Sequence, residues 1–199
     1  MTYKYLDKML TYTVTQIYEI FRKYRKMDFD ELNIIQQTSE LYAELKDLNW
    51  RVFNDIAHHY YESEPHGDSE LLWLFLQERL EEVNKTIKYS YNSEVIRKRD
   101  RLMEALIATK GDKQEYDSAM RYWTQMTGWF GVEITDAALK QARIDDGVKR
   151  VMWVSEHDNR VCGVCDDLDG RIFPIREVPA KPHPGCRCHL ERVRDSEDE

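Results

Sequence analysis

The sequence predicts an α+β protein, in which a long-helix N-terminal region is followed by a small C-terminal domain with short strands. Through the first two thirds of the 199 residues, apolar side chains recur at three- and four-residue steps, the pattern of a buried helix face. All four cysteines and four of the five prolines lie after residue 160, so loops and short strands are expected there. Charged residues are 33% of the chain and the formal net charge is −8, which indicates a water-soluble, helix-rich protein.

Three long helices are expected in the first 110 residues. The first spans residues 6–24, the second about 31–61 and the third about 70–109. The third begins with an apolar run at 71–76, which should be buried or form an interface. The second has an apolar stripe at close to heptad spacing, which predicts long helices packed around a bundle core. That stripe consists of Ile34, Thr38, Leu41, Leu45, Leu48, Val52, Ile56 and His59.

Two further helices are expected after residue 115. The first spans residues 115–130 and ends where Gly128 and Gly131 mark a boundary. The second spans residues 135–146, and Gly147 follows it as a C-terminal cap. The apolar segment that comes next, up to residue 154, is expected to form a strand.

The predicted organisation has three parts: a helical region over residues 1–130, a small domain over 131–194 and an acidic tail over 195–199. No segment approaches the roughly 18 apolar residues of a membrane span, and the N-terminus lacks the apolar core of a signal peptide. We therefore expect no membrane partner, and a protein made and kept inside a cell or in a particle assembled there.

Cysteine and histidine residues near the C-terminus have the spacing of a structural zinc site. Cys162 and Cys165 form a Cys-x-x-Cys turn, and His183 and Cys186 repeat that spacing, with Cys188 two residues further on. Zn²⁺ prefers four thiolate and imidazole ligands in a tetrahedron. Five candidates therefore compete for four positions, and the choice between Cys186 and Cys188 stays open. Bound zinc would supply folding energy that a small core cannot, so the C-terminal domain is predicted to be zinc-stapled.

Other chemistry fits this segment less well. A redox pair or a disulfide is the alternative to zinc, but a thioredoxin-like motif needs a helix, and the segment from Asp166 onward lacks a helical pattern. Asp169-Gly170 is expected to form a hairpin turn rather than a catalytic group. His189 is an alternative metal ligand, and His157 is expected in a surface loop. Nothing matches a catalytic triad or a phosphate-binding loop, so we expect no enzymatic activity.

A wider set of residues around the cysteines forms a recognisable signature. It comprises Trp153, Asp158, Arg160, Cys162, Cys165, Leu168, Asp169, Gly170, His183, Pro184, Cys186, Arg187 and Cys188. With this signature, residues 132–194 resemble the phage Mu F-like minor head protein family, also called phage head morphogenesis proteins. The helical residues before them show no signature of that family.

The resemblance implies a structural component of a tailed-phage virion. It implies a minor capsid protein that acts in head assembly at or near the portal vertex, with the portal protein and the major capsid protein as partners. The helical region over residues 1–130 would dock on the portal or the capsid. The protein would be made in the host cytoplasm and end in the virion head.

An alternative function is a zinc-stabilised DNA-binding protein that accompanies the packaged double-stranded DNA. Phosphate contacts need clustered Lys and Arg, and the C-terminal domain is locally basic. A solvated surface would contain the same side chains, and the acidic balance of the whole chain argues against a general nucleic-acid binder. The basic residues are Arg150, Arg160, Arg171, Arg176, Lys181, Arg187, Arg192 and Arg194.

Overall fold

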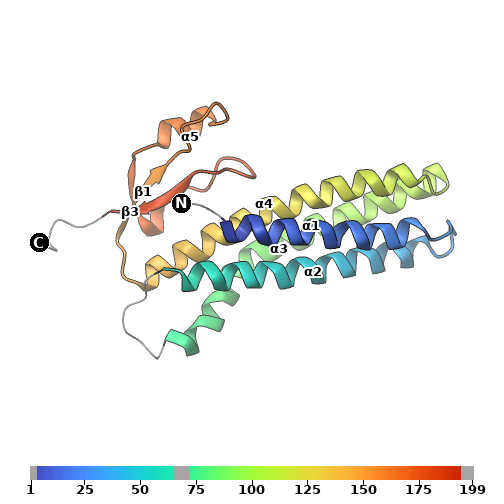
Figure 1. Cartoon of the computed structure of the whole chain (residues 1–199), viewed down its shortest axis with the longest axis horizontal. Coiled ribbons are helices and arrows are strands. Elements are labelled where there is room, and N and C mark those ends of the chain that lie inside the picture. Colours follow the sequence, from blue (N-terminus) through green and yellow to red (C-terminus); the bar gives the residue numbers. More distant parts are fainter. Residues whose placement is uncertain (1–3, 65–71, 194–199) are drawn as a thin grey trace, which may run out of the picture.

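Four long helices form a bundle in the computed structural model, which describes residues 4–64 and 72–193 and, between 72 and 89, the backbone alone. The helices are α1 (Lys4–Arg25), α2 (Ile34–Glu62), α3 (Leu72–Thr109) and α4 (Lys113–Asp145). They lie side by side and alternate in direction (Figure 1). The first three confirm the predicted helices to within a few residues. The expected burial of the apolar run at 71–76 falls outside the described side chains.

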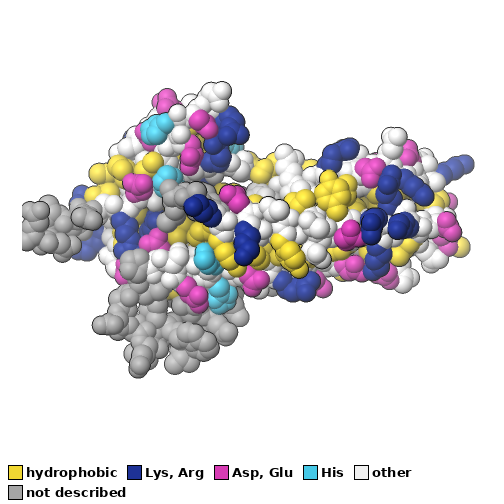
Figure 2. All heavy atoms as spheres, viewed as in Figure 1, with side chains coloured by type: hydrophobic (Ala, Val, Ile, Leu, Met, Phe, Trp, Pro, Cys, Tyr) yellow, Lys and Arg dark blue, Asp and Glu magenta, His cyan; other side chains and the backbone are white. Residues whose placement is uncertain are grey.

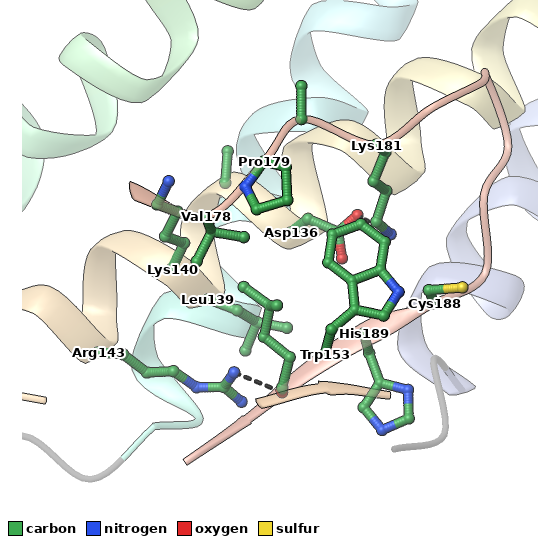
Figure 3. Close-up of a pocket in the computed structure, with 13 residues that line it drawn as sticks. Asp136, Leu139, Lys140, Arg143, Trp153, Val178, Pro179, Lys181, Cys188 and His189 are labelled. Carbon is green, nitrogen blue, oxygen red and sulfur yellow. Dashed lines mark hydrogen bonds and ion pairs between the residues drawn. The ribbon is translucent and has the colours of Figure 1, made fainter. Parts of the chain in front are cut away.

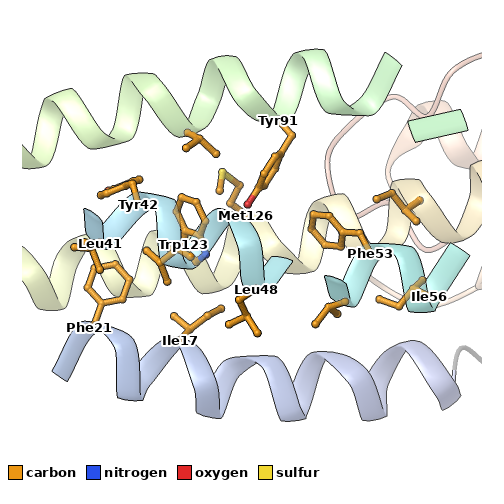
Figure 4. Close-up of a cluster of buried hydrophobic side chains, with 14 of the residues drawn as sticks. Ile17, Phe21, Leu41, Tyr42, Leu48, Phe53, Ile56, Tyr91, Trp123 and Met126 are labelled. Atoms are coloured by element: carbon orange, nitrogen blue, oxygen red, sulfur yellow. The ribbon is translucent and has the colours of Figure 1, made fainter. Parts of the chain in front are cut away.

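The bundle core contains the side chains that the apolar stripes predict. In α2, the stripe residues from Ile34 to Ile56 are all buried, and Figure 4 shows several of them facing Ile17 and Phe21 of α1. His59, the last residue of that stripe, is exposed instead, and its ring stacks on Tyr5 with 3.7 Å between centroids. The core continues through aromatic side chains of α3 and α4, so the bundle has an extensive hydrophobic core of its own.

The boundary predicted at Gly128 and Gly131 is wrong, because α4 continues without a break through both glycines. Gly131 faces α1, where an added Cβ atom would lie 3.1 Å from Leu6 Cδ1 and 3.2 Å from Leu10 Cδ2. The glycine thus allows a close approach of two helices. Thr135, where a separate helix was expected to begin, donates its hydroxyl to the Gly131 carbonyl inside α4, at 2.9 Å.

The end of α4 is as predicted. Gly147 has a φ of +75° directly after the helix, and Val148 N donates to the Arg143 carbonyl at 2.9 Å. This pattern of a left-handed residue and a six-residue hydrogen bond closes a helix. The change from helix to strand thus falls after Gly147. The predicted division into domains at residue 131 lies inside α4 and stays a prediction.

The C-terminal part is a three-stranded antiparallel sheet, which confirms the α+β fold class. Its strands are β1 (Arg150–Val154), β2 (Ile172–Pro174) and β3 (His189–Arg192), in the order β2-β1-β3. The short helix α5 (Gly163–Leu168) lies between β1 and β2, and the turn η1 (Ile175–Glu177) follows β2. Figure 1 shows the sheet and α5 at the end of the bundle where α4 finishes.

Two local predictions in this part are wrong. Residues from Asp166 to Leu168 belong to α5, although their sequence lacks a helical pattern. Asp169 and Gly170 therefore end a helix and do not join two strands directly. A helix of 6 residues is too short to show an apolar period, and its stability comes from tertiary contacts.

Replacing Gly111 by alanine is expected to destabilise the bundle more than the same change at Gly147. Both glycines have positive φ, +85° and +75°. A Cβ atom is unfavourable in this conformation, so alanine at either position should lower the free energy of unfolding by about 1 kcal/mol. At Gly111 the new Cβ would also lie 2.7 Å from Phe29 Cγ, whereas at Gly147 nothing lies within 4 Å. We expect a further loss of about 1–3 kcal/mol at Gly111, measured by urea denaturation. Equal losses at the two positions would contradict the packing at Phe29.

Candidate metal centre

Five sulfur and nitrogen donors converge beside the sheet, and they are the five predicted from the sequence. Candidate ligand atoms of Cys162, Cys165 and His183 lie within 4.8 Å of one another, as do those of Cys165, Cys186 and Cys188. Cys165 belongs to both groups, and its Sγ lies 3.4 Å from Cys186 Sγ. Clustered thiols and an imidazole of this kind can hold a metal ion.

Two tight turns bring these donors together. Cys162 precedes α5 with extended backbone, and its carbonyl accepts a hydrogen bond from Asp166 N at 3.0 Å, so Cys165 is placed one turn into the helix. In the second turn, Cys186 N donates to the His183 carbonyl at 3.3 Å, and Gly185 adopts a φ of +70°. The Cys-x-x-Cys and His-x-x-Cys spacings thus each correspond to one tight turn.

The cysteines differ in burial and in the protonation that their surroundings favour. Cys165, Cys186 and Cys188 are buried, Cys162 is half-buried and His183 is exposed. Burial raises the pKa of Cys165 and of Cys188, since a thiolate is poorly solvated there. Hydrogen bonds from the backbone and side chain of Cys165 lower the pKa of Cys162. A bound cation would stabilise the thiolate form of every cysteine that it contacts.

Acidic residues of the signature act as structural acceptors beside the cluster. Asp158 accepts hydrogen bonds from Arg187 Nη2 at 2.7 Å and from Arg160 N at 2.9 Å, and these lower the pKa of Asp158 to about 2. Asp169 accepts from Ser155 N at 2.7 Å, and this bond lowers its pKa as well. Both carboxylates hold loops in place, which supports a structural rather than a catalytic interpretation of the signature.

The loop that carries His183 and Cys186 is tied to the bundle. Lys181 Nζ donates to the Cys186 carbonyl at 3.0 Å and also forms an ion pair with Asp136 of α4. An added Cβ atom at Gly185 would lie 3.1 Å from Trp129 Cδ1, so this turn lies against the α4 side chain. The second half of the cluster is therefore positioned by α4 as well as by the sheet.

A buried ion-pair network, which the sequence analysis missed, joins the sheet to the bundle. Arg143 of α4 donates through Nε and Nη2 to Glu64 Oε1, at 3.0 and 2.7 Å, and through Nη1 to the Leu190 carbonyl at 2.7 Å. Arg192 of β3 donates to Glu64 Oε2 at 2.9 Å and also pairs with Asp146. Arg143 could have been noticed because it lies on the apolar face of α4, whereas nothing marks Glu64 in a polar loop segment.

An apolar groove of about 290 Å³ lies between α4 and the sheet, next to the cluster (Figure 3). Its walls include Leu139 and Lys140 of α4, Val178 and Pro179 of the loop after η1, and Trp153 of β1. The pKa of Lys140 is lowered by burial.

The other histidines of the sequence analysis lie outside the cluster. His157 is exposed in a loop, as predicted, and its Nε2 lies 3.6 Å from Asp169 Oδ2. His189 is buried beside Glu191, with 3.3 Å between Nε2 and Oε1, and belongs to neither donor group within the described residues.

Several basic residues proposed for DNA contact form ion pairs within the protein. Lys181 pairs with Asp136, Arg187 with Asp158 and Arg192 with Glu64. Figure 2 shows basic and acidic side chains side by side on this face of the molecule. Residues 148–193 contain eight Lys and Arg against seven Asp and Glu, so the domain is close to neutral. No helix among the described residues is long and apolar enough to span a membrane.

The fold and the site define a class of protein: a bundle of long antiparallel helices that carries a small sheet with a cysteine–histidine cluster. The sequence model of the Phage Mu protein F like family matches residues 76–191, more than half of the chain. The chain belongs to this family, the phage head morphogenesis family that its C-terminal signature resembles. The match begins in α3, so the similarity extends beyond residues 132–194 to include the α3–α4 pair.

Comparison with individual proteins adds one relative. An uncharacterized protein of Haemophilus influenzae is 39% identical over 70 residues. The match covers 32% of this chain and 16% of that protein, so the two share one segment of limited length. No solved structure matches the chain.

Proposed function

We propose that the protein is a minor capsid or head morphogenesis protein that acts at or near the portal, with its C-terminal domain stabilised by a structural zinc ion. Membership of the Phage Mu protein F like family supports the role in the phage head. Two groups of clustered cysteine and histidine donors in a small domain, which share Cys165, are the observation that supports the metal.

The donor set fits zinc. Thiolates and imidazole are the ligands that structural zinc sites use, with Zn–S distances of about 2.3 Å and hence about 3.8 Å between sulfurs of a tetrahedron. The 3.4 Å between Cys165 Sγ and Cys186 Sγ is near that separation. His183 Nδ1 lies 3.2 Å from the Pro184 carbonyl, and a hydrogen bond there would leave Nε2 as a ligand atom. We propose that the zinc is held by four of Cys162, Cys165, His183, Cys186 and Cys188.

In this proposal the zinc ion stabilises the fold of the C-terminal domain and takes part in no reaction. Four of the donors lie in two tight turns, and Cys188 lies directly ahead of β3. The nearby carboxylates of Asp158 and Asp169 already accept structural hydrogen bonds. The ion would fix α5 against the loop before β3, in a domain whose hydrophobic cluster is small. We propose that the helical region over residues 1–130 provides the surface that docks on the portal or the major capsid protein.

Co-expression with the portal protein and the major capsid protein of the same phage genome tests this function. Tagged portal is expected to retain the full chain, which should also be found by mass spectrometry in purified virion heads. Tagged portal of an unrelated phage is the control and should not retain it. Failure of both head proteins to retain the chain, together with virions that lack it, would overturn the proposal.

A further inference from the structure

We propose that Trp153 is a positioning residue of the metal site, whose indole N–H donates a hydrogen bond to the Cys188 thiolate and so selects Cys188 as a ligand. The inference rests on the proposed zinc site and extends it. Neither the spacing of the candidate ligands nor the family match indicates a hydrogen bond from Trp153 to the Cys188 sulfur.

The indole N–H group of Trp153 is a buried donor without an acceptor in the part of the chain that the structure describes. Trp153 is 2% exposed, and its Nε1 has no hydrogen-bond partner within the described residues. A buried N–H group without a partner costs free energy, and most such groups in folded proteins are paired. A metal-bound sulfur beside this N–H group would supply an acceptor and remove that cost.

The indole of Trp153 lies among the candidate ligands. Trp153 packs in the same buried cluster as Cys165, Cys186 and Cys188. Figure 3 shows the nitrogen-bearing edge of the indole turned toward Cys188. No hydrogen bond joins the Trp153 indole to Cys188 among the described residues. A neutral thiol is a weak acceptor, whereas a thiolate bound to a metal is charged and accepts well.

The sheet holds both partners in a fixed relation. Trp153 is paired with Leu190 across β1 and β3, and Cys188 lies two residues before Leu190, directly ahead of β3. On the other side, Trp153 N donates to the Arg171 carbonyl at 2.9 Å, and Gly170 N donates to the Trp153 carbonyl at 2.8 Å. These pairings fix the backbone of Trp153, and the ring itself is buried in the cluster with the cysteines, so it is suited to orient the Cys188 sulfur.

If the Trp153 ring served only for packing, its N–H group would not be needed. Trp123 in the helical bundle provides a control for this possibility. Trp123 of α4 is 1% exposed, and its Nε1 also has no hydrogen-bond partner within the described residues. It packs against Tyr42 and Tyr91 in the helical core, in a cluster separate from the cysteines. Trp123→Phe thus removes an equally buried indole N–H from a place where no metal ligand lies.

Zinc affinity measured by competition with a chromophoric chelator tests the inference, using the full chain and the variants Trp153→Phe and Trp123→Phe. Partners that orient a ligand typically change metal affinity by about 10- to 100-fold. We expect a loss of that size for Trp153→Phe and no loss for Trp123→Phe. Cobalt-loaded Trp153→Phe should also show a shifted thiolate-to-cobalt absorption band. Circular dichroism of each variant checks that the helices are intact.

A double-mutant cycle separates the hydrogen bond from general packing. In a Cys188→Ser background, Trp153→Phe should cause little further loss of zinc affinity, whereas in a Cys186→Ser background its full effect should persist. Unchanged affinity and absorption in Trp153→Phe, or an equal effect of this change in both backgrounds, would overturn the inference while leaving the zinc site intact. A wild-type chain that binds neither zinc nor cobalt would overturn the zinc site and the inference together.

Discussion

Removal of the proposed zinc ion by a chelator is expected to unfold the small sheet while the four-helix bundle stays folded. For structural zinc sites the apparent binding free energy is about 10–16 kcal/mol, and it acts as folding free energy because the site does not exist in the unfolded chain. The hydrophobic cluster around Trp153 contains few residues besides the cysteines themselves. The bundle, by contrast, has an extensive core from α1 to α4 and contains none of the ligands.

Amide hydrogen exchange resolves the two parts. On addition of chelator, protection should disappear from β1 and β3 and remain in the centres of α2 and α4. Cys165→Ser should have the same effect without a chelator, since Cys165 belongs to both donor groups, and it should be more damaging than Cys162→Ser, which affects one.

Val164→Ser is the matched control for these cysteine variants. Val164 lies on α5, between Cys162 and Cys165 in the sequence, and is 54% exposed, so its replacement should leave protection unchanged. Retention of strand protection in the metal-free Cys165→Ser chain would contradict the role of the metal in folding this domain.

Replacing Glu64 by leucine is expected to destabilise the protein by about 3–5 kcal/mol, the usual effect of removing one partner of a buried ion pair. The side chains of Glu64 and Arg143 are 7% and 6% exposed. Without the carboxylate, the Arg143 guanidinium would keep the Leu190 carbonyl as a partner but would have no neutralising charge there. Arg192 would keep its contact with Asp146. The loss should appear in urea denaturation of zinc-loaded protein.

Two further variants show whether the buried charge is responsible. Glu64→Leu combined with Arg143→Met should recover much of the lost stability, because apolar replacement of a whole buried pair is often neutral. Glu19→Leu breaks an exposed pair with Arg22 on α1 and should change the free energy of unfolding by less than about 1 kcal/mol. Similar losses for Glu64→Leu and Glu19→Leu would show that the network does not hold the sheet to the bundle.

The helices were the most predictable part of the fold, and the reason is their length. The apolar stripe of α2 repeats over eight positions, so its burial follows from periodicity alone, with His59 at the helix end as the exception. The prediction of a boundary inside α4 was wrong because glycine usually indicates the end of a helix. The reason for Gly131, its close contact with α1, becomes clear only from the packing of the two helices. The six residues of α5 are too few for periodicity to indicate a helix.

The sequence by itself determined the candidate ligands, because cysteines and histidine at these spacings have few other uses, and the signature around them pointed to the family that the chain belongs to. Only the tertiary structure revealed that Cys165 is shared by two donor groups, that Glu64 and Arg143 join the sheet to α4, and that the Trp153 indole faces Cys188. The spacing of residues in the sequence determines which side chains a single tight turn can bring together. Glu64 and Arg143 are 79 positions apart, and a contact of this kind depends on how helices and strands pack. The local sequence pattern therefore does not predict it.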